Sequence, residues 1–227
     1  MAELERDPGY VTFLDEAEQE QQLRGDAYEQ AAAGVLDELR EAGYPVTAIG
    51  ELPRSGFRYP GAVPVLVRWL PKVSDRVVKE DMIRALSVPW AKADAEPILR
   101  EEFRRLPTQQ DPTGALRWTI GNALEAMADR SSFDGLVDLA QDRRFGFARE
   151  MVVRALAKTK DPRAIDVLIG LLQDPDVVIA ALTALGKLRA ERARSAVTEL
   201  MGHHDPAVRK EAKKALEKID RGHVRPT

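Results

Sequence analysis

Few side chains in this 227-residue sequence have the chemistry that catalysis or metal binding requires. There is no cysteine, which excludes disulfides, thiolate nucleophiles and cysteine-based zinc sites. Two of the three histidines stand together in the run His203-His204-Asp205, whose residue types suit a metal ion. Adjacent residues point in divergent directions in a helix or turn, however, and no second pair of ligands follows nearby. We therefore predict a surface turn here and no metal site.

Carboxylates that could act as an acid and base pair are adjacent in the sequence. Glu80-Asp81 and Glu101-Glu102 are such pairs, and adjacent residues of a helix do not face each other. The sequence also lacks a phosphate-binding glycine loop, a His-Glu-x-x-His zinc motif and a Gly-x-Ser-x-Gly nucleophile motif. These observations favour a non-enzymatic protein without a cofactor.

Basic side chains recur at regular intervals in two sets. The first set is expected to be structural, because turn acids such as Asp174 can pair with it across or within repeated units. This set is Lys79, Arg117, Arg149 and Arg209. The second set flanks a recurring Ala-Leu pair and is predicted to meet phosphates or an acidic partner, with a solvated helix surface as the alternative. It consists of Arg84, Arg154, Lys158, Lys187, Lys214 and Lys218.

Trp118 is the residue that we predict to anchor a partner. It follows Arg117, at a position where the other units carry mostly polar residues. Tryptophan is enriched among the residues that dominate binding energy at interfaces. Simple burial is the alternative for Trp118, whereas Trp69 and Trp90 are assigned to packing.

These residues belong to a unit that occurs five times. Ala-Leu pairs recur at intervals of 29 to 38 residues, with an apolar residue seven positions before the alanine in all five units. The pairs begin at Ala85, Ala123, Ala155, Ala184 and Ala215. Around the last pair, apolar residues follow a 3.6-residue period, and Asp205-Pro206 supplies a capping acid and a first-turn proline. Each unit is therefore predicted to contain two helices, and the fold to be all-α.

The Asp-Pro turns, the Val-Arg step and the run Ala184–Leu188 resemble HEAT repeats. They are most similar to the short bacterial subtype first associated with phycobilin lyases, and the resemblance extends from Gly61 to Ile219. It implies a right-handed α-solenoid of about five helical pairs, whose second helices line a concave surface. It also implies a binding scaffold. Val178 departs from the pattern, because a basic residue is expected there.

Residues 1–60 are predicted to form an acidic N-terminal helical cap and loop, followed by the solenoid at 61–227. Asp26–Ala42 has the apolar stripe of an amphipathic helix, and Asp15–Arg24 is predicted to be a separate polar helix. Gly43–Pro60, rich in glycine and proline, is predicted to be a loop. Residues 1–50 contain twelve acidic and three basic residues, a net charge of −9, which leaves +6 for the rest of a chain of net charge −3.

Two functions agree with these features. The first is a scaffold that binds a protein or peptide on its concave face, and the second is nucleic-acid binding, as in the alkylpurine DNA glycosylases built from HEAT-like repeats. The basic rows and Trp118 favour the second function, whereas the acidic N-terminal segment and the absence of a recognisable catalytic aspartate oppose it. A role in chromophore attachment rests on the repeat resemblance alone. A cytoplasmic location is expected, because no signal peptide and no membrane-spanning run is present.

Overall fold

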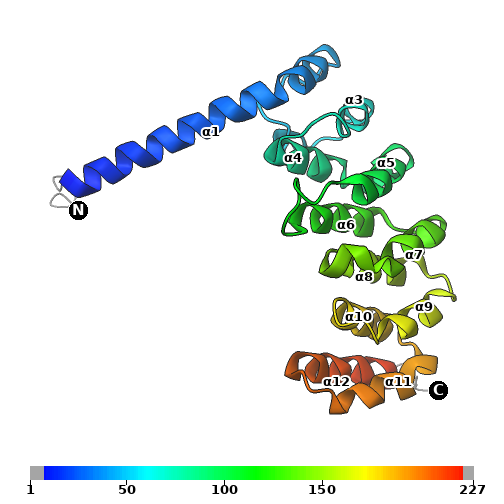
Figure 1. Ribbon diagram of the computed structural model, residues 1–227. Helices are drawn as coiled ribbons and strands as arrows, with labels where there is room; N and C mark the ends of the chain where they lie inside the picture. The colour runs from blue at the N-terminus through cyan, green and yellow to red at the C-terminus, as the bar shows by residue number, and fades with distance from the viewer. Residues whose placement is uncertain (1–7, 222–227) are drawn as a thin grey trace. The chain divides into compact units, whose positions relative to one another are not determined.

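The computed structural model describes the backbone of residues 8–221 and the side chains of Tyr10 and residues 19–221. Over this range it contains twelve α-helices joined by turns and short 3-10 helices, and no strand (Figure 1). The chain divides into two compact units, residues 1–82 and 83–227. The predicted all-α architecture is confirmed, whereas the predicted domain boundary after residue 60 stays a prediction.

The N-terminal unit begins with one long helix, α1 (Pro8–Glu41). The prediction of two separate helices was wrong, because Gly25 lies inside α1 without interrupting it. A glycine lowers the stability of a helix by only about 1 kcal/mol relative to alanine. Side chains one turn apart also pair beside Gly25 and across it. Glu20 pairs with Arg24 at 2.6 Å, and Gln22 donates a hydrogen bond to Asp26 at 2.9 Å.

The C-terminal half of α1 contributes the buried part of this unit. Its apolar stripe, Ala32, Val35, Leu36 and Leu39, is buried. The helix packs on α3 (Ala62–Trp69), and the short helix α2 (Glu51–Arg54) lies in the predicted loop. Gly34 allows this packing, because a Cβ there would lie 2.5 Å from the Trp69 ring.

Helices α3 to α12 form the five predicted pairs. The first helices are α3, α5 (Lys92–Arg105), α7 (Phe133–Gln141), α9 (Ala164–Leu171) and α11 (Arg194–Glu199). The second helices are α4 (Arg76–Leu86), α6 (Ala115–Met127), α8 (Glu150–Thr159), α10 (Val178–Leu188) and α12 (Pro206–Asp220). The 3-10 helices are η2 (Pro89–Ala91), η3 (Arg130–Ser132), η4 (Arg143–Arg149), η5 (Glu191–Ala193) and η6 (Leu200–Gly202).

Within the unit of residues 83–227, the second helices stack directly on one another. Helix α6 packs on α8, α8 on α10, and α10 on α12, whereas neighbouring first helices touch little (Figure 1). The alanines of the Ala-Leu pairs are buried. Their small side chains let successive second helices approach closely. The repeat thus forms an α-solenoid.

The three arginines of the first basic set have a structural role, but only Arg117 and Arg149 pair with turn acids, Asp111 and Asp174, as the sequence predicted. Arg149 is fully buried and donates to the carbonyl oxygens of Ala140 and Gly146 and to Asp174, the last at 3.0 Å. Arg117 donates to the carbonyls of Phe103 and Leu106 at the end of α5. Arg209 donates to the carbonyls of His203 and His204. Each of these arginines joins a second helix to the turn before it.

The turn predicted at His203-His204-Asp205 is present before α12. The Nδ1 atom of His203 accepts the backbone N–H of Asp205, and the Asp205 carboxylate accepts the N–H of Ala207. Among residues 8–221, no three metal-binding side chains gather in one place. No helix in this range has the length and hydropathy that crossing a bilayer requires.

Candidate functional site

The predicted binding residues lie on the exposed side of the second helices, which we call the second-helix face. Trp118 is in the first turn of α6 and is 38% exposed, and Arg154 is exposed on α8. Lys187 is exposed at the end of α10, whereas Lys158 at the end of α8 is only half-exposed. The remaining predicted residues, all exposed, are Arg84 on α4 and Lys214 and Lys218 on α12.

Three large apolar side chains are exposed near the N-terminal ends of consecutive second helices, and we call them the apolar patch. Trp118 on α6 and Ile179 on α10 occupy equivalent repeat positions and are each 38% exposed. Phe147, immediately before α8, is 49% exposed and lies against Gly114 at the start of α6. Sequence reasoning missed Phe147; the available signal was Phe145-Gly146-Phe147 in place of an Asp-Pro turn.

Carboxylates neutralise part of the second basic set. Lys214 pairs with Glu211 at 3.0 Å, and Thr183 donates to the same carboxylate at 2.8 Å. Burial would raise the pKa of Glu211, but hydrogen bonds from Lys214 and Thr183 lower it below its usual value. Lys158 donates to the backbone carbonyl of Glu125 at 2.8 Å, which joins α8 to α6. Lys158 therefore connects α8 to α6, whereas the ion pair of Lys214 lies within α12.

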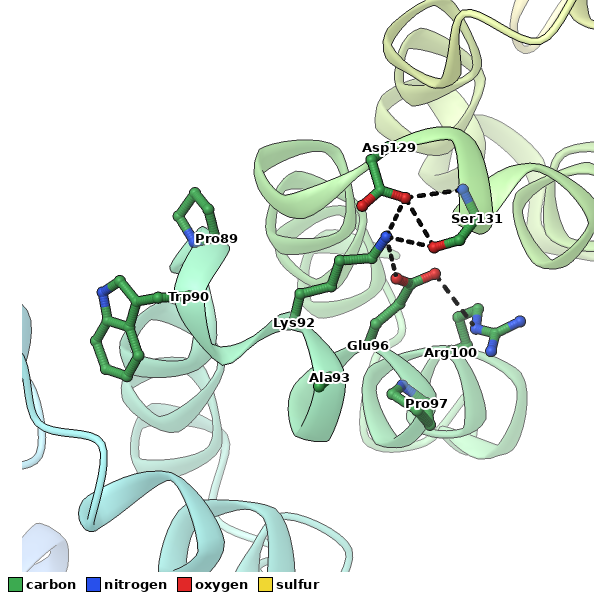
Figure 2. A pocket seen from close by; sticks show the side chains of 9 residues that line it. All are labelled: Pro89, Trp90, Lys92, Ala93, Glu96, Pro97, Arg100, Asp129 and Ser131. Carbon is green, nitrogen blue, oxygen red and sulfur yellow. Dashed lines mark hydrogen bonds and ion pairs between the residues drawn. The ribbon is translucent and has the colours of Figure 1, made fainter.

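A separate pocket opens beside the start of α5 (Figure 2). Its volume is about 510 Å³, with Pro89 and Trp90 from η2 on one side and charged residues of α5 on the other. Its lining residues are Pro89, Trp90, Lys92, Ala93, Glu96, Pro97, Arg100, Asp129 and Ser131. Sequence reasoning did not find this pocket.

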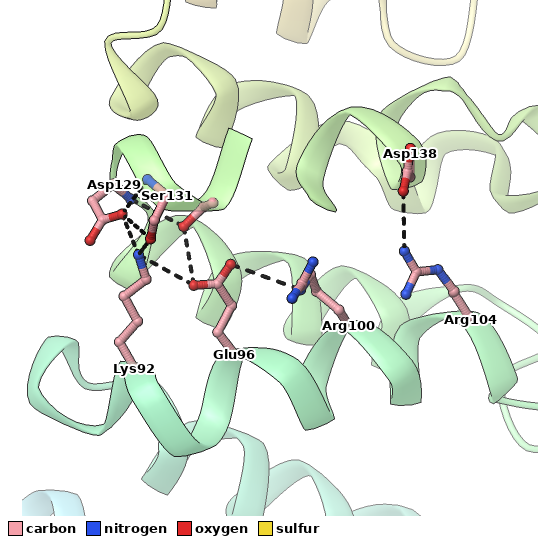
Figure 3. Close-up of polar contacts among 8 residues, drawn as sticks. Lys92, Glu96, Arg100, Arg104, Asp129, Ser131 and Asp138 are labelled. Carbon is pink, nitrogen blue, oxygen red and sulfur yellow. Dashed lines mark hydrogen bonds and ion pairs between the residues drawn. The ribbon is translucent and has the colours of Figure 1, made fainter. Parts of the chain in front are cut away.

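A polar network closes the charged side of the pocket (Figure 3). The Lys92 ammonium donates to Ser131 Oγ at 2.8 Å, lies 3.4 Å from Glu96 and pairs with Asp129. The hydrogen bond from Lys92, followed by those from Ser131, lowers the pKa of Asp129 from 3.8 to about 2. The buried Glu96 carboxylate also accepts a hydrogen bond from the Ser132 hydroxyl at 3.1 Å, and it lies 3.9 Å from the Nε atom of Arg100.

This network is structural in character. Lys92 on α5 lies between two carboxylates, those of Glu96 and Asp129, and donates to Ser131 of η3. One turn after Arg100, Arg104 lies 3.8 Å from Asp138 of α7 (Figure 3). One side of α5 is thereby fastened to η3 and α7.

Comparison with known proteins agrees with the helical repeat. A family model described as HEAT repeats matches residues 105–181 and 173–226. No curated protein matches the sequence. A designed armadillo repeat protein in complex with the peptide (KR)4 is similar with 19% identity and a TM-score of 0.48, covering 89% of this chain and 94% of that one. A second designed armadillo repeat protein has 15% identity and a TM-score of 0.46, covering 88% and 94%.

Proposed function

The chain belongs to the HEAT-repeat family, and we propose that it is a non-enzymatic scaffold that binds a protein or peptide partner on its second-helix face. The apolar patch carries this proposal. Trp118, Phe147 and Ile179 come from three consecutive repeats, so a partner lying across the stack would contact all three. Exposed apolar side chains grouped in this way are typical of interaction sites.

We place this face on the concave side of the solenoid. The second helices pack directly on one another, and the first helices make fewer contacts across repeats. In a curved stack, the layer with the closer packing is the inner one. A concave layer would surround an extended or helical peptide. The cysteine-free sequence is compatible with the expected cytoplasmic location.

Nucleic-acid binding remains the second candidate, favoured by cations that no described carboxylate neutralises. Arg154 and Lys187 are exposed, and within residues 8–221 neither forms an ion pair. Phosphate contacts made by such residues would weaken steeply as salt is raised. Ile179 in the apolar patch favours the protein partner, because an exposed aliphatic side chain contributes little to nucleic-acid binding, whereas the aromatic Trp118 and Phe147 suit either a protein or stacked bases.

Affinity capture from native lysate tests the proposal, with and without nuclease, using wild-type protein and two variants. Trp118→Ala removes the proposed anchor. Met201→Ala is the matched control, because Met201 is 40% exposed but lies in η6, outside the second-helix face. We expect to capture a partner protein in stoichiometric amount, and nuclease should not remove it. The partner should bind the Trp118→Ala variant about thirtyfold more weakly than wild type, the equivalent of ~2 kcal/mol. It should bind the Met201→Ala variant with wild-type affinity.

Two outcomes would reject the proposal. Bound nucleic acid that nuclease removes, with no protein remaining, would establish the second candidate. A captured protein that binds Trp118→Ala with wild-type affinity would show that the apolar patch is not the site.

A further inference from the structure

Four cations surround a small cavity between the C-terminal ends of α10 and α12. The cavity has a volume of about 290 Å³. It is lined by Gly186, Lys187, Arg189, Lys218 and Arg221, and within the described part of the chain no carboxylate lines it. We call it the basic pocket.

The basic pocket has an excess of positive charge that its surroundings do not compensate. Within residues 8–221, only Arg221 of the four cations forms an ion pair, at 3.9 Å from Glu217. The two helix C-termini contribute about −0.5 charge each. Together with Glu217 they offset about two of the four positive charges. Glu211 also interacts with Lys218, but its charge is already paired with Lys214, so a net charge of about +2 remains. Lys158 and Lys214, elsewhere on the second helices, each have a carboxylate nearby.

Gly186 explains how the two helices come close enough to share the pocket. A Cβ at this position would lie 3.0 Å from Ala215 Cα and 3.3 Å from the Lys218 Cδ atom. Because Gly186 has no side chain, α12 packs against the last turn of α10, and Lys218 extends over the glycine. The close approach thus brings the cations of both helices to one cavity.

Arg189 occupies a backbone conformation that does not favour arginine. It ends α10 with φ 51° and ψ 47°, in the left-handed region. Glycine is the usual residue at such a helix end, and other L-residues pay about 1 kcal/mol there. Among residues 8–221 the only other non-glycine with positive φ is Lys160, which ends α8. The turn therefore does not require the arginine side chain.

We propose that the basic pocket binds a phosphomonoester group. A phosphomonoester carries about −1.5 to −2 charges at neutral pH, which matches the net charge of the pocket. A phosphodiester carries only one charge, so a nucleic-acid backbone matches the pocket less well. Guanidinium groups such as that of Arg189 bind phosphate oxygens in a bidentate manner. This site extends beyond the scaffold function and does not require the apolar patch.

Titration of the full chain with three probes, monitored by NMR or calorimetry, tests this site. The probes are inorganic phosphate, a blocked phosphoserine and dimethyl phosphate, a diester. We expect the first two to bind and the diester to bind at least tenfold more weakly. Tighter binding of phosphoserine than of inorganic phosphate would indicate a phosphorylated protein side chain as the source, and equal binding would indicate a free phosphate compound.

Arg189→Gly is the decisive variant, because glycine adopts the backbone conformation of Arg189 without strain. We expect it to weaken phosphate binding at least tenfold while melting at the wild-type temperature or above it. Lys160→Gly makes the same backbone change at the end of α8, outside the pocket, and should bind phosphate normally. Trp118→Ala should also bind phosphate normally, which separates this test from that of the scaffold function.

The proposal fails if phosphate and phosphoserine do not bind, or if the diester binds equally well. It also fails if Arg189→Gly retains wild-type affinity.

Discussion

Arg149 has the most demanding environment of the charged residues in the helix stack. Its side chain is fully buried, and Asp174, itself almost fully buried, comes from the following repeat. Burial would raise the pKa of Asp174, but the hydrogen bond from Arg149 lowers it below its usual value. Asp174 also accepts the backbone N–H of Asp176 and lies 3.4 Å from Arg143, so it connects the turn before α10 to the preceding repeat.

Asp174→Ala should destabilise the protein more than the loss of any exposed ion pair. It would leave the Arg149 guanidinium buried with two carbonyls and the more distant Asp176, at 3.6 Å. Breaking a buried pair in this way costs about 3–5 kcal/mol, which urea unfolding would measure. Asp166→Ala, which breaks an exposed pair with Arg192, is the control and should cost less than about 1 kcal/mol. Equal costs would contradict this account.

The structural arginines could be predicted from the sequence, whereas most of their partners could not. The repeat spacing identified the first basic set, and Asp174 was an expected partner. The arginines donate mainly to backbone carbonyls, such as those of Ala140 and Phe103. Every residue has such a carbonyl, so the sequence does not indicate which one accepts the bond. Trp118 could be singled out because it interrupts a mostly polar position, and its exposure agrees with that interpretation.

At the scale of the element, two glycines of α1 should respond to alanine in opposite ways. A Cβ added at Gly25 would have no atom within 4 Å, so Gly25→Ala should gain about 0.5–1 kcal/mol of local helix stability. At Gly34 the added methyl group would collide with the Trp69 ring, so Gly34→Ala should cost about 1–3 kcal/mol.

Far-UV circular dichroism and hydrogen exchange near residue 25 measure the first effect, and urea unfolding measures the second. A stabilising Gly34→Ala would mean that Trp69 does not pack on α1 as described.

The elements themselves were more predictable than the pockets between them. The five helical pairs follow from the spacing of the Ala-Leu pairs, because each pair must be buried in the stack. The continuity of α1 was missed because the glycine penalty at Gly25 is small compared with the stability of a long helix. The pocket beside α5 joins Lys92 to Ser131, which are 39 residues apart, so no local motif indicates it.

At the scale of the whole molecule, charge is distributed unevenly along the chain. Residues 1–24 contain seven acidic and two basic residues, a net charge of −5, so the chain without them would carry +2 in place of −3. Residues 19–24 of α1 are exposed, and the buried stripe of this helix begins only at Ala32. Residues 19–24 therefore contribute little to the buried core of this unit.

A chain that begins at Gly25 should melt within about 2 °C of the full chain, because the described side chains of residues 19–24 are exposed. It should also bind heparin and single-stranded DNA more tightly at low salt, since long-range repulsion of polyanions has been removed. Salt-gradient elution from heparin measures this change, and raising the salt to several hundred millimolar should abolish it. Unchanged elution would show that the acidic segment does not shield the basic repeats, and a large drop in melting temperature would show that it packs against them.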